Sequence, residues 1–441
     1  MLECTVDEVE TVVLDNGSHS LKIGFSGEDL PRSIVPSLRV TVTRQAESDD
    51  GQGEDGSSLA TEVLLGNDAR KAFAEDAELN YPIHNGMIVD KDATEDLWEV
   101  ALRKLTPSET DDMVCLLTCP PLASSAIKEW IFEVFFERFR CKRMALLQPG
   151  PLSLFSSGRS RGLVVEIGHS ITSAVPVFEG FPLAYATFRS FRAGGAVTSS
   201  LSQLLAETSW FNTYMHLHSP AVTEEIKHKL CLVAIPDERS HLLREDTSEF
   251  EDRAFQLPDG TVIEVRFLKV LPLMERPLDY DTHILLLMAL QLDQRLRCRP
   301  AELLFDDSLH VEASLNEDNV PPCLQSELRA SDTLQSLVHA AIAATDPEFQ
   351  EEMQQNIVLA GGSSLLGNLS QRLHGELLCI EQIDRDPFCI ATDSHRRFSA
   401  WVGGSMLASL GTFEKFCIQR HAYEEGNRTL SNMIHEKNMG R

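Results

Sequence analysis

Apolar residues gather in short runs along the chain, and three of these runs end in a turn of glycine and small polar residues. The first covers residues 12–14, is followed by Asp15-Asn16-Gly17-Ser18, and resumes at residues 21–25. The second covers residues 162–167 and resumes at residues 174–178. Short apolar runs bounded by turn residues predict strands, so both units are predicted to be strand-turn-strand hairpins. The third run, residues 356–360 before Gly361-Gly362-Ser363-Ser364, predicts a buried strand, a glycine turn and the start of a helix.

The two hairpins share one spacing of polar residues. An acidic residue stands two positions before a glycine in each, at Asp15 and Gly17 and again at Glu166 and Gly168. Because this layout recurs in the two halves of the chain, we expect an α/β fold of two duplicated lobes. Binding sites commonly lie between domains, so a ligand is expected in the cleft between the lobes.

The first turn carries the residues that a phosphate site needs. Backbone N–H groups point into such a bend, Gly17 tolerates positive φ, and Ser18 adds a hydroxyl group. Lys22 supplies a cation, and Asp15 at the end of the first strand could hold a divalent ion directly or through water. The alternative is a plain hairpin turn that binds nothing, because Asn-Gly between apolar runs is also the commonest hairpin signal.

Composition narrows the function classes. A chain of 441 residues, 43% of them hydrophobic, exceeds what one core usually fills and predicts two large lobes. The net charge of −28 argues against nucleic acid or anionic lipid as a direct partner, because both bind basic surfaces. Ten scattered cysteines without a Cys-x-x-Cys pair, an acidic start and the lack of an 18-residue apolar run predict an intracellular protein, cytoplasmic and cytoskeletal or nuclear, with reduced thiols and no membrane span.

Three other segments stand out from their surroundings. Residues 45–60 are acidic and rich in Gly and Ser, which predicts a surface loop. Residues 284–290 form a strongly apolar run that could be a buried helix or a docking helix. Residues 401–410 mix apolar and small residues, which predicts a tightly packed helix.

Motifs along nearly the whole chain resemble actin and the actin-related proteins, in the family's order. They are Leu30-Pro31-Arg32, Tyr81-Pro82-Ile83 with Gly86 and Trp98, Pro176-Val177-Phe178-Glu179-Gly180, Ile226-Lys227-His228-Lys229-Leu230-Cys231, Leu257-Pro258-Asp259-Gly260, Leu359-Ala360-Gly361-Gly362, and Ser399-Ala400-Trp401-Val402-Gly403-Gly404-Ser405. The chain therefore resembles a divergent actin-related protein, in the superfamily that also contains heat-shock chaperones and sugar kinases.

The resemblance implies an actin-like fold of four subdomains around a central cleft that encloses ATP or ADP with Mg²⁺ or Ca²⁺. The implied bounds are residues 1–40, 81–156 and 385–441 for subdomain 1, 41–80 for subdomain 2, 157–193 and 303–384 for subdomain 3, and 194–302 for subdomain 4. Subdomain 2 includes the acidic loop, and subdomain 4 carries an insertion at about residues 266–295.

The same resemblance assigns roles to individual residues. It implies phosphate binding by Gly17, Ser18, Lys22 and Gly168. It implies contacts with adenosine by Lys227, Gly361, Gly362, Ser363 and Arg397. Asp15 and Glu166 would hold the metal ion through its waters, and Gln148 would orient the attacking water if the protein hydrolyses ATP.

Departures from the family pattern weaken the expectation of hydrolysis. The second hairpin has Glu166, His169 and Ser173 where the family has aspartate, aspartate and histidine, and His19 replaces a glycine of the first turn. Phosphoryl transfer depends on positioning, and an error of about 1 Å can cost on the order of a hundredfold in rate. We therefore expect a slow or absent ATPase.

Two features argue against an actin-type homopolymer. The acidic loop replaces a loop through which actin subunits meet, and the insertion at residues 266–295 would obstruct that contact or serve as a docking segment. The leading hypothesis is a structural or regulatory subunit of a multiprotein complex, of cytoskeletal or chromatin type, with actin-family proteins or other subunits as partners. The alternatives are a filament-forming ATPase and, more remotely, a kinase of sugars or small metabolites.

Overall fold

The computed structural model describes eleven stretches of the chain. They are residues 10–45, 59–71, 78–105, 113–206, 220–235, 253–256, 262–265, 294–309, 333–381, 387–425 and 430–438. Most of the acidic loop at 45–60, most of the insertion at 266–295 and the apolar run at 284–290 lie outside the described residues. The expectations about those segments stay predictions.

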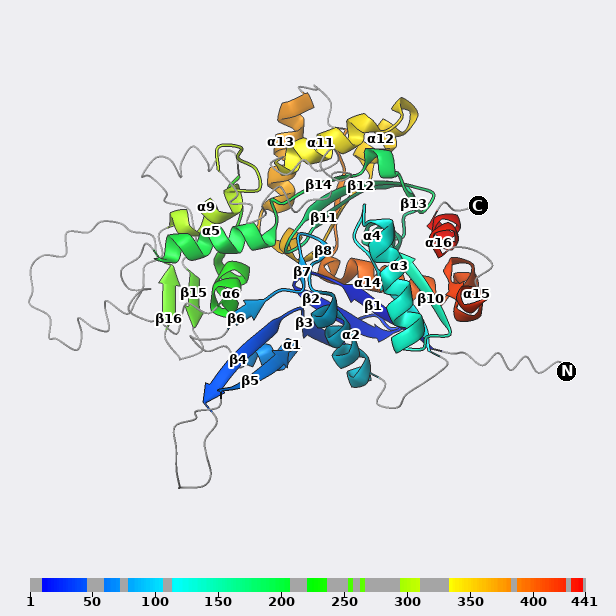
Figure 1. Ribbon diagram of the computed structural model, residues 1–441. Coiled ribbons are helices and arrows are strands. Elements are labelled where there is room, and N and C mark those ends of the chain that lie inside the picture. Colours follow the sequence, from blue (N-terminus) through cyan, green and yellow to red (C-terminus); the bar gives the residue numbers. More distant parts are fainter. Residues whose placement is uncertain are drawn as a thin grey trace, which may run out of the picture.

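The first large sheet contains the first predicted hairpin. Its strands follow the order β19-β10-β9-β1-β2-β3, in which β1 and β2 pair antiparallel while β9 and β10 run parallel to β1 (Figure 1). The bounds are β1 Thr11–Asn16, β2 Ser20–Phe25, β3 Ser33–Pro36, β9 Val114–Thr118, β10 Arg143–Leu147 and β19 Ile418–Gln419.

The second large sheet repeats this arrangement around the second predicted hairpin. Strands β11 and β12 pair antiparallel, β17 and β18 run parallel to β11, and β13 and β14 pair with β12. The bounds are β11 Gly162–Ile167, β12 Thr172–Phe178, β13 Phe181–Pro182, β14 Phe188–Ser190, β17 Ile357–Ala360 and β18 Ile390–Thr392. The prediction of a duplicated α/β fold is confirmed.

Two helices lie between the sheets and join them. Helix α14 (Ser399–Ala408) packs on β1, and helix α4 (Pro149–Ser156) packs on β11 and against α14. A Cβ atom at Gly403 would lie 1.9 Å from the carbonyl oxygen of Leu152, so only glycine allows the two helices to approach this closely. The buried indole of Trp401 donates a hydrogen bond to the carbonyl oxygen of Val13 (3.0 Å), which fixes α14 on the first sheet. The tightly packed helix expected over this segment is confirmed.

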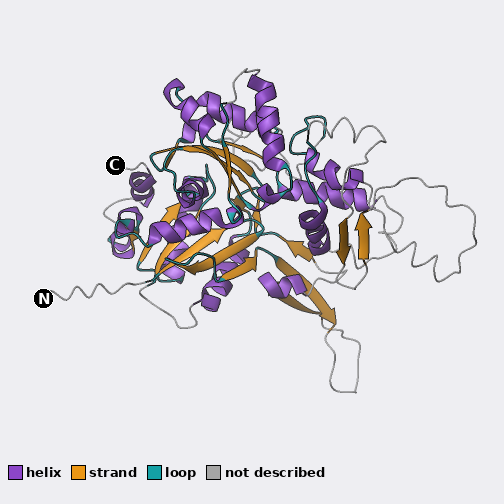
Figure 2. Ribbon diagram, turned by 180° about the vertical axis from the view of Figure 1, so that it is seen from behind, coloured by secondary structure: helices purple, strands orange, loops and turns teal. Residues whose placement is uncertain are grey.

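The apolar runs form the cores that the sequence predicted. Residues of β1 and β9 pack with α2 and α3 into one core, and residues of β11 and β17 pack with α5, α6, α11 and α13 into another. The helices on these cores are α2 Lys91–Leu105, α3 Ser125–Glu133, η1 Val134–Arg138, α5 Gly194–Ala206, α6 Pro220–Leu230, α9 Gln294–Glu302, α11 Leu334–Ala344, α12 Pro347–Gln355, α13 Leu369–Glu381, α15 Arg420–Glu424 and α16 Leu430–Asn438 (Figure 2).

Smaller elements complete each lobe. A three-stranded sheet of β4, β5 and β6 carries α1, and two short hairpins are formed by β7 with β8 and by β15 with β16. Their bounds are β4 Arg39–Gln45, β5 Leu59–Leu65, α1 Gly66–Lys71, β6 Glu78–Asn80, β7 Ile83–His84, β8 Met87–Ile88, β15 Arg253–Gln256 and β16 Val262–Val265. Short 3₁₀ turns occur at η2 Ala184–Ala186, η6 Gly362–Leu365, η7 Arg396–Phe398 and η8 Phe413–Phe416. The helix expected after Gly361 is therefore the four-residue turn η6.

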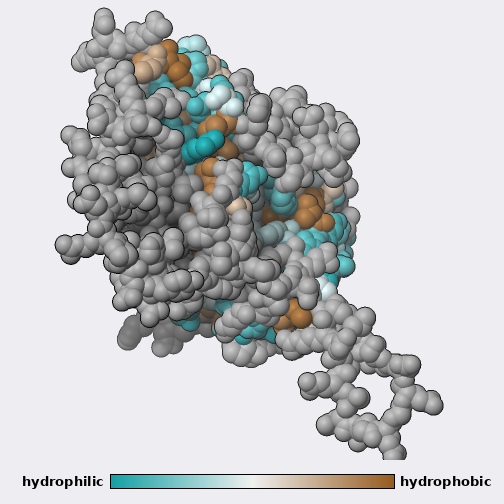
Figure 3. All heavy atoms as spheres, turned by 90° about the vertical axis from the view of Figure 1, so that its left-hand side faces the viewer, coloured by the Kyte–Doolittle hydropathy of each residue, from teal (hydrophilic) through white to brown (hydrophobic). Residues whose placement is uncertain are grey.

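On the face shown in Figure 3, brown hydrophobic residues are interspersed among teal hydrophilic ones. Among the described cysteines, six are buried and Cys379 and Cys389 are exposed. No helix in the described part of the chain has the length and apolar character needed to cross a membrane.

Candidate functional site

A cavity of about 340 Å³ lies where the two hairpin turns approach α6, η6 and η7. Both turns contribute to its wall, together with residues that follow β7, β9 and β10 in the chain. The polar side chains that line it are Asp15, Asn16, Ser18, His19, Ser20, Lys22, Thr118, Ser153, Glu166, His169, Ser173, Lys227, His228, Ser363, Arg396 and Arg397. The expected ligand site between two lobes therefore corresponds to a real cavity.

Asp15 is held by partners on both neighbouring strands. Its Oδ2 accepts a hydrogen bond from Lys22 Nζ at 2.7 Å, and its Oδ1 accepts one from Thr118 Oγ1 at 2.8 Å. The Thr118 hydroxyl also accepts from the backbone N–H of Asn16 at 2.8 Å. Because Asp15 is buried, these bonds compensate its lost hydration and fix the end of β1.

The first turn keeps backbone donors free for a ligand. No described residue accepts a hydrogen bond from the backbone N–H of Ser18 or His19, and both residues line the cavity. Gly17 does not use its tolerance of positive φ, because its φ does not lie in the left-handed region. Glycine is required at this position because there is no room for a side chain: a Cβ would lie 2.7 Å from the carbonyl oxygen of Ser20 and 3.1 Å from Lys22 Nζ.

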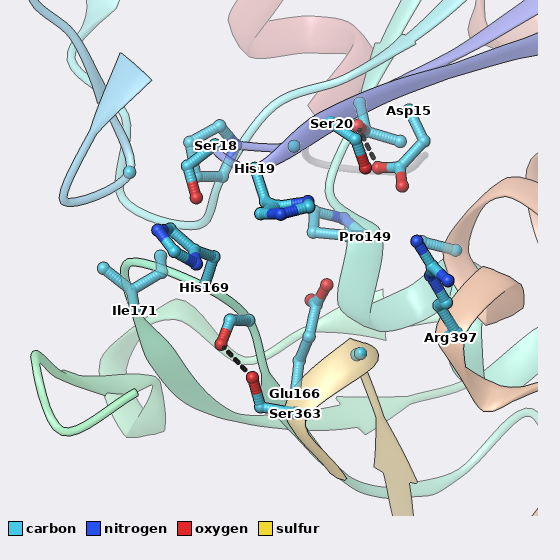
Figure 4. Close-up of a pocket in the computed structure, with 18 of the residues that line it drawn as sticks. Asp15, Ser18, His19, Ser20, Pro149, Glu166, His169, Ile171, Ser363 and Arg397 are labelled. Atoms are coloured by element: carbon cyan, nitrogen blue, oxygen red, sulfur yellow. Dashed lines mark hydrogen bonds between the residues drawn. The ribbon is translucent and has the colours of Figure 1, made fainter. Parts of the chain in front are cut away.

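The second turn is fixed by a carbonyl oxygen that accepts two hydrogen bonds. The Gly168 oxygen accepts from the backbone N–H of Gly194 (3.0 Å) and from the hydroxyl of Ser363 (2.9 Å). Gly361 has φ of +86°, and a Cβ there would lie 2.4 Å from the carbonyl oxygen of Ile167. These glycines allow β17, α5 and the second turn to approach one another closely. Figure 4 shows the hydrogen bond of Ser363 in this region as a dashed line.

Glu166 projects into the cavity from the second hairpin (Figure 4). Burial and, to a smaller extent, the charge of Asp15 raise the pKa of this carboxyl group to about 7, although the charge of Lys22 acts in the opposite direction. The Glu166 carboxyl group therefore holds a proton more readily near neutral pH than an ordinary glutamate does.

Two histidines, one from each turn, meet beside a glutamate of α6. The rings of His19 and His169 have centroids 5.2 Å apart, and both enter the cavity (Figure 4). His19 Nε2 lies 2.9 Å from Glu224 Oε2, and His169 Nδ1 lies 3.9 Å from Glu224 Oε1. Since His19 belongs to the first hairpin and Glu224 to α6, this contact bridges the two lobes.

Burial and neighbouring charge separate the ionisation of these groups. Burial lowers the pKa of His169 to about 3, helped by the positive charges of His19 and Lys227. For Glu224, burial raises the pKa, but the hydrogen bond from His19 and the charges of His19, His169 and Lys227 outweigh it and lower the pKa to about 2. Glu224 is therefore ionised near neutral pH, and His19 Nε2 must donate its hydrogen to it.

The opposite end of the cavity is formed by α6, η6 and η7. Lys227 is buried there, and its Nζ donates to the carbonyl oxygen of Gly194 (3.1 Å) and to Thr198 Oγ1 (2.7 Å). Arg396 joins the two 3₁₀ turns by donating from Nη2 to the carbonyl oxygen of Ser364 (3.1 Å). Arg397, which is exposed, and the apolar side chain of Leu366 also line the cavity.

The structure brings nearly all of the residues singled out in the sequence to this cavity. Every one of them except Gln148 lines it; Gln148 caps α4, and its neighbour Pro149 is the lining residue. The roles assigned to these residues by resemblance stay predictions. Sequence reasoning missed Thr118, Gly194 and Glu224, because their importance comes from contacts between segments far apart in the chain.

Comparisons with known proteins now identify the family. The family model described as Actin matches residues 6–438. The chain belongs to the actin family. Actin-like protein 7B of Homo sapiens is 30% identical over 423 residues, which cover 95% of this chain and 87% of that protein. Actin-like protein 7B of Macaca fascicularis is 30% identical over 425 residues with the same coverage.

In this actin-family protein, the described residues of the cavity form a poor ligand set for the divalent ion that the family implies. Among the described residues that line the cavity, Asp15 and Glu166 are the only ones with acidic side chains, and both oxygens of Asp15 already accept hydrogen bonds. No group of three His, Cys, Asp or Glu residues among the described stretches could hold a metal ion. Mg²⁺ is usually held by one or two carboxylates together with phosphate oxygens and waters, so any ion here would depend on the ligand for most of its coordination.

Proposed function

We propose that this actin-family protein binds ATP or ADP in the cavity as a structural ligand, with little or no hydrolysis. One observation carries the proposal: free backbone donors and Lys22 lie at one end of a cavity between the lobes, and a glycine turn with an apolar residue lies at the other. The first set suits phosphate groups, which bind to turns with unpaired N–H groups. The second leaves space beside Gly362 and Leu366 for a flat, partly apolar base.

Weak hydrolysis is proposed because the groups that would activate water are displaced or exchanged. Gln148, the residue expected to orient water, does not line the cavity. His169 occupies the second turn where the family pattern has an acidic residue, and it lies against His19. Since hydrolysis requires close positioning of water and phosphate, binding can persist where turnover is lost.

The proposed role is that of a structural or regulatory subunit in a multiprotein complex, cytoskeletal or chromatin-type. Its proposed partners are other actin-family proteins or further subunits of that complex, in the cytoplasm, the cytoskeleton or the nucleus. A homopolymer is disfavoured because a surface with net charge −28 repels its own copies. Nucleotide bound across the lobes would hold them in one arrangement and so present a constant surface to a partner.

Thermal unfolding in the presence of ligand tests the binding step. Saturating ATP or ADP with Mg²⁺ is expected to raise the unfolding temperature, because a ligand at about 100 times its Kd stabilises the native state by about 2.7 kcal/mol. Adenosine alone should stabilise it less. An unchanged unfolding temperature with every nucleotide would overturn the proposal.

Phosphate release and pelleting, measured on the same preparation across a concentration series, test the rest. We expect release close to the rate without protein and no concentration above which the protein pellets. Release that increases on assembly, together with a critical concentration, would instead support the filament-forming ATPase.

A further inference from the structure

The two lobes contact each other on more than one side of the cavity. Helices α4 and α14 form one such contact, in which a Cβ at Gly403 would lie 1.9 Å from the carbonyl oxygen of Leu152. Helix α6, which lies away from α4 and α14 in Figure 1, forms another, because Glu224 on it contacts His19 in the first turn. All three helices give residues to the cavity wall, so the two contacts lie on different sides of it.

The contact beside α6 consists of four side chains, two from each lobe. His19 in the first turn and Tyr81 before β7 belong to the first lobe, whereas His169 in the second turn and Glu224 belong to the second. Glu224 Oε2 lies 2.9 Å from His19 Nε2, and Glu224 Oε1 lies 3.9 Å from His169 Nδ1. The centroid of the His169 ring lies 5.2 Å from that of His19 and 6.3 Å from that of Tyr81, which are distances typical of packed aromatic rings.

Each of these side chains is fixed within its own lobe. The carbonyl oxygen of His19 accepts a hydrogen bond from the backbone N–H of Ser37 (3.0 Å), and Tyr81 packs on the small core of β4 and α1. The carbonyl oxygen of His169 accepts one from the backbone N–H of Gly195 (2.6 Å), and α6 packs into the core of the second lobe. The lobes therefore cannot move apart on this side without separating the four side chains.

The hydrogen bond from His19 to Glu224 is the strongest link in this group. Glu224 has a lowered pKa of about 2 and is ionised near neutral pH, and its side chain is only 12% exposed. Hydrogen bonds to an ionised group are stronger than those between neutral groups. Both partners are residues of the chain itself, so the contact needs no ligand in order to form.

This link depends on a residue that the family pattern does not contain. His19 replaces a glycine of that pattern, and glycine has no side chain that could reach α6. A ligand enclosed between two lobes leaves when they separate, so a link across the lobes slows its release.

We propose that His19, Tyr81, His169 and Glu224 form an interlobe latch, which keeps the lobes closed without a ligand and delays the release of a ligand bound between them. Closure by the latch goes beyond the proposed function, and only the delayed release rests on it. The two parts are therefore tested separately, by one experiment without nucleotide and one with it.

Small-angle X-ray scattering of the full chain without nucleotide tests closure. We expect His19→Ala and Glu224→Ala each to have a larger radius of gyration than the wild type, because lobes that lose a link rotate apart about their remaining contacts. Glu225→Ala is the matched control and should keep the wild-type radius, since this next residue of α6 is 43% exposed and bonds to Lys229 in the same helix. Circular dichroism distinguishes opened lobes from an unfolded chain.

Two results of the scattering experiment would overturn the latch. One is an equal radius of gyration in the wild type, His19→Ala and Glu224→Ala, all without nucleotide. The other needs no variant: a wild type that is larger without nucleotide than with saturating ADP would show that closure depends on the ligand.

Release of a fluorescent ATP analogue, displaced by excess ATP, tests the delay. His19→Ala and Glu224→Ala should each release it about tenfold faster than the wild type, as expected for the loss of a hydrogen bond to a charged group. The double variant should be no faster than either single one, because both substitutions remove the same contact. Glu225→Ala should release it at the wild-type rate.

The outcomes separate the latch from the proposed function. Rates that multiply in the double variant, or single variants that release the analogue as slowly as the wild type, would contradict a shared latch and leave nucleotide binding standing. If the wild type binds no nucleotide, the proposed function fails, and scattering of the ligand-free variants still decides whether the latch closes the lobes.

Discussion

The two hairpins have the same topology but hold their acidic residue in different ways. Asp15 on β1 has Lys22 opposite it on β2 and Thr118 at the end of the neighbouring parallel strand, and it bonds to both. Glu166 on β11 has Ser173 opposite it on β12 and Ala360 beside it on β17. No hydrogen bond joins the Glu166 carboxyl group to another described residue, and burial dominates its ionisation.

This difference shows that the fold and the chemistry of the two acids depend on different features of the hairpins. Strand pairing and buried apolar runs are the same in both lobes, so the duplicated architecture persists. Two side-chain positions beside the acid decide whether its oxygens are held by hydrogen bonds, as in Asp15, or whether burial raises its pKa to about 7, as in Glu166. Substitutions at shared backbone positions should therefore affect stability most, and those at the side-chain positions should affect one lobe more than the other.

The largest expected effect comes from the backbone of the second lobe. Gly361→Ala forces a left-handed φ on alanine and places its Cβ 2.4 Å from the carbonyl oxygen of Ile167. We expect a loss of about 3 kcal/mol in the free energy of unfolding, measured by urea denaturation. Gly362→Ala is the matched control, because its nearest neighbour is Arg397 Cγ at 3.8 Å, and it should change little. Equal losses in both variants would contradict the explanation.

A smaller effect is expected from the side chain that holds Asp15. Thr118→Val keeps the shape of the side chain but removes the hydroxyl that bonds to Asp15 and to the backbone N–H of Asn16. Leaving two buried polar groups without this partner should cost about 2 kcal/mol in the free energy of unfolding.

Ser173→Ala provides the comparison in the second lobe. No hydrogen bond of the Ser173 hydroxyl involves a described residue, so the loss should stay below about 0.5 kcal/mol in the same denaturation experiment. If Ser173→Ala costs as much as Thr118→Val, the two acids are held more alike than the hydrogen bonds indicate.

Local patterns in the sequence predicted the hairpins, the strand before Gly361 and the packed helix after Phe398, because each depends on neighbours within a few residues. They did not predict the contact of His19 with Glu224 or of Thr118 with Asp15, whose partners are 205 and 103 positions apart. Gln148 shows the reverse case: family resemblance placed it at the reacting water, yet its position at the start of α4 keeps it out of the cavity wall. Contacts of this kind depend on how the lobes pack, which no local pattern encodes.

An effect smaller than that of Thr118→Val concerns the pH dependence that the second turn gives to stability. The folded-state pKa of His169, about 3, lies below its ordinary value of 6.5 because of burial and the charges of His19, Lys227 and His84, with Glu224 acting in the opposite direction. Below pH 6.5 the unfolded chain therefore binds a proton that the folded protein resists, and stability falls as the pH decreases until it levels off near pH 3.

Between about pH 8 and about pH 5.5, this loss for His169 should amount to about 1 kcal/mol in the free energy of unfolding, since the side chain is only 21% exposed. His169→Gln should lose that much less stability over the same interval in urea denaturation, whereas the exposed His421→Gln should keep the wild-type profile. Identical profiles for the wild type and His169→Gln would mean that His169 is not held in its neutral form, and the contrast between a first turn fixed by hydrogen bonds and a second turn governed by burial would then be lost.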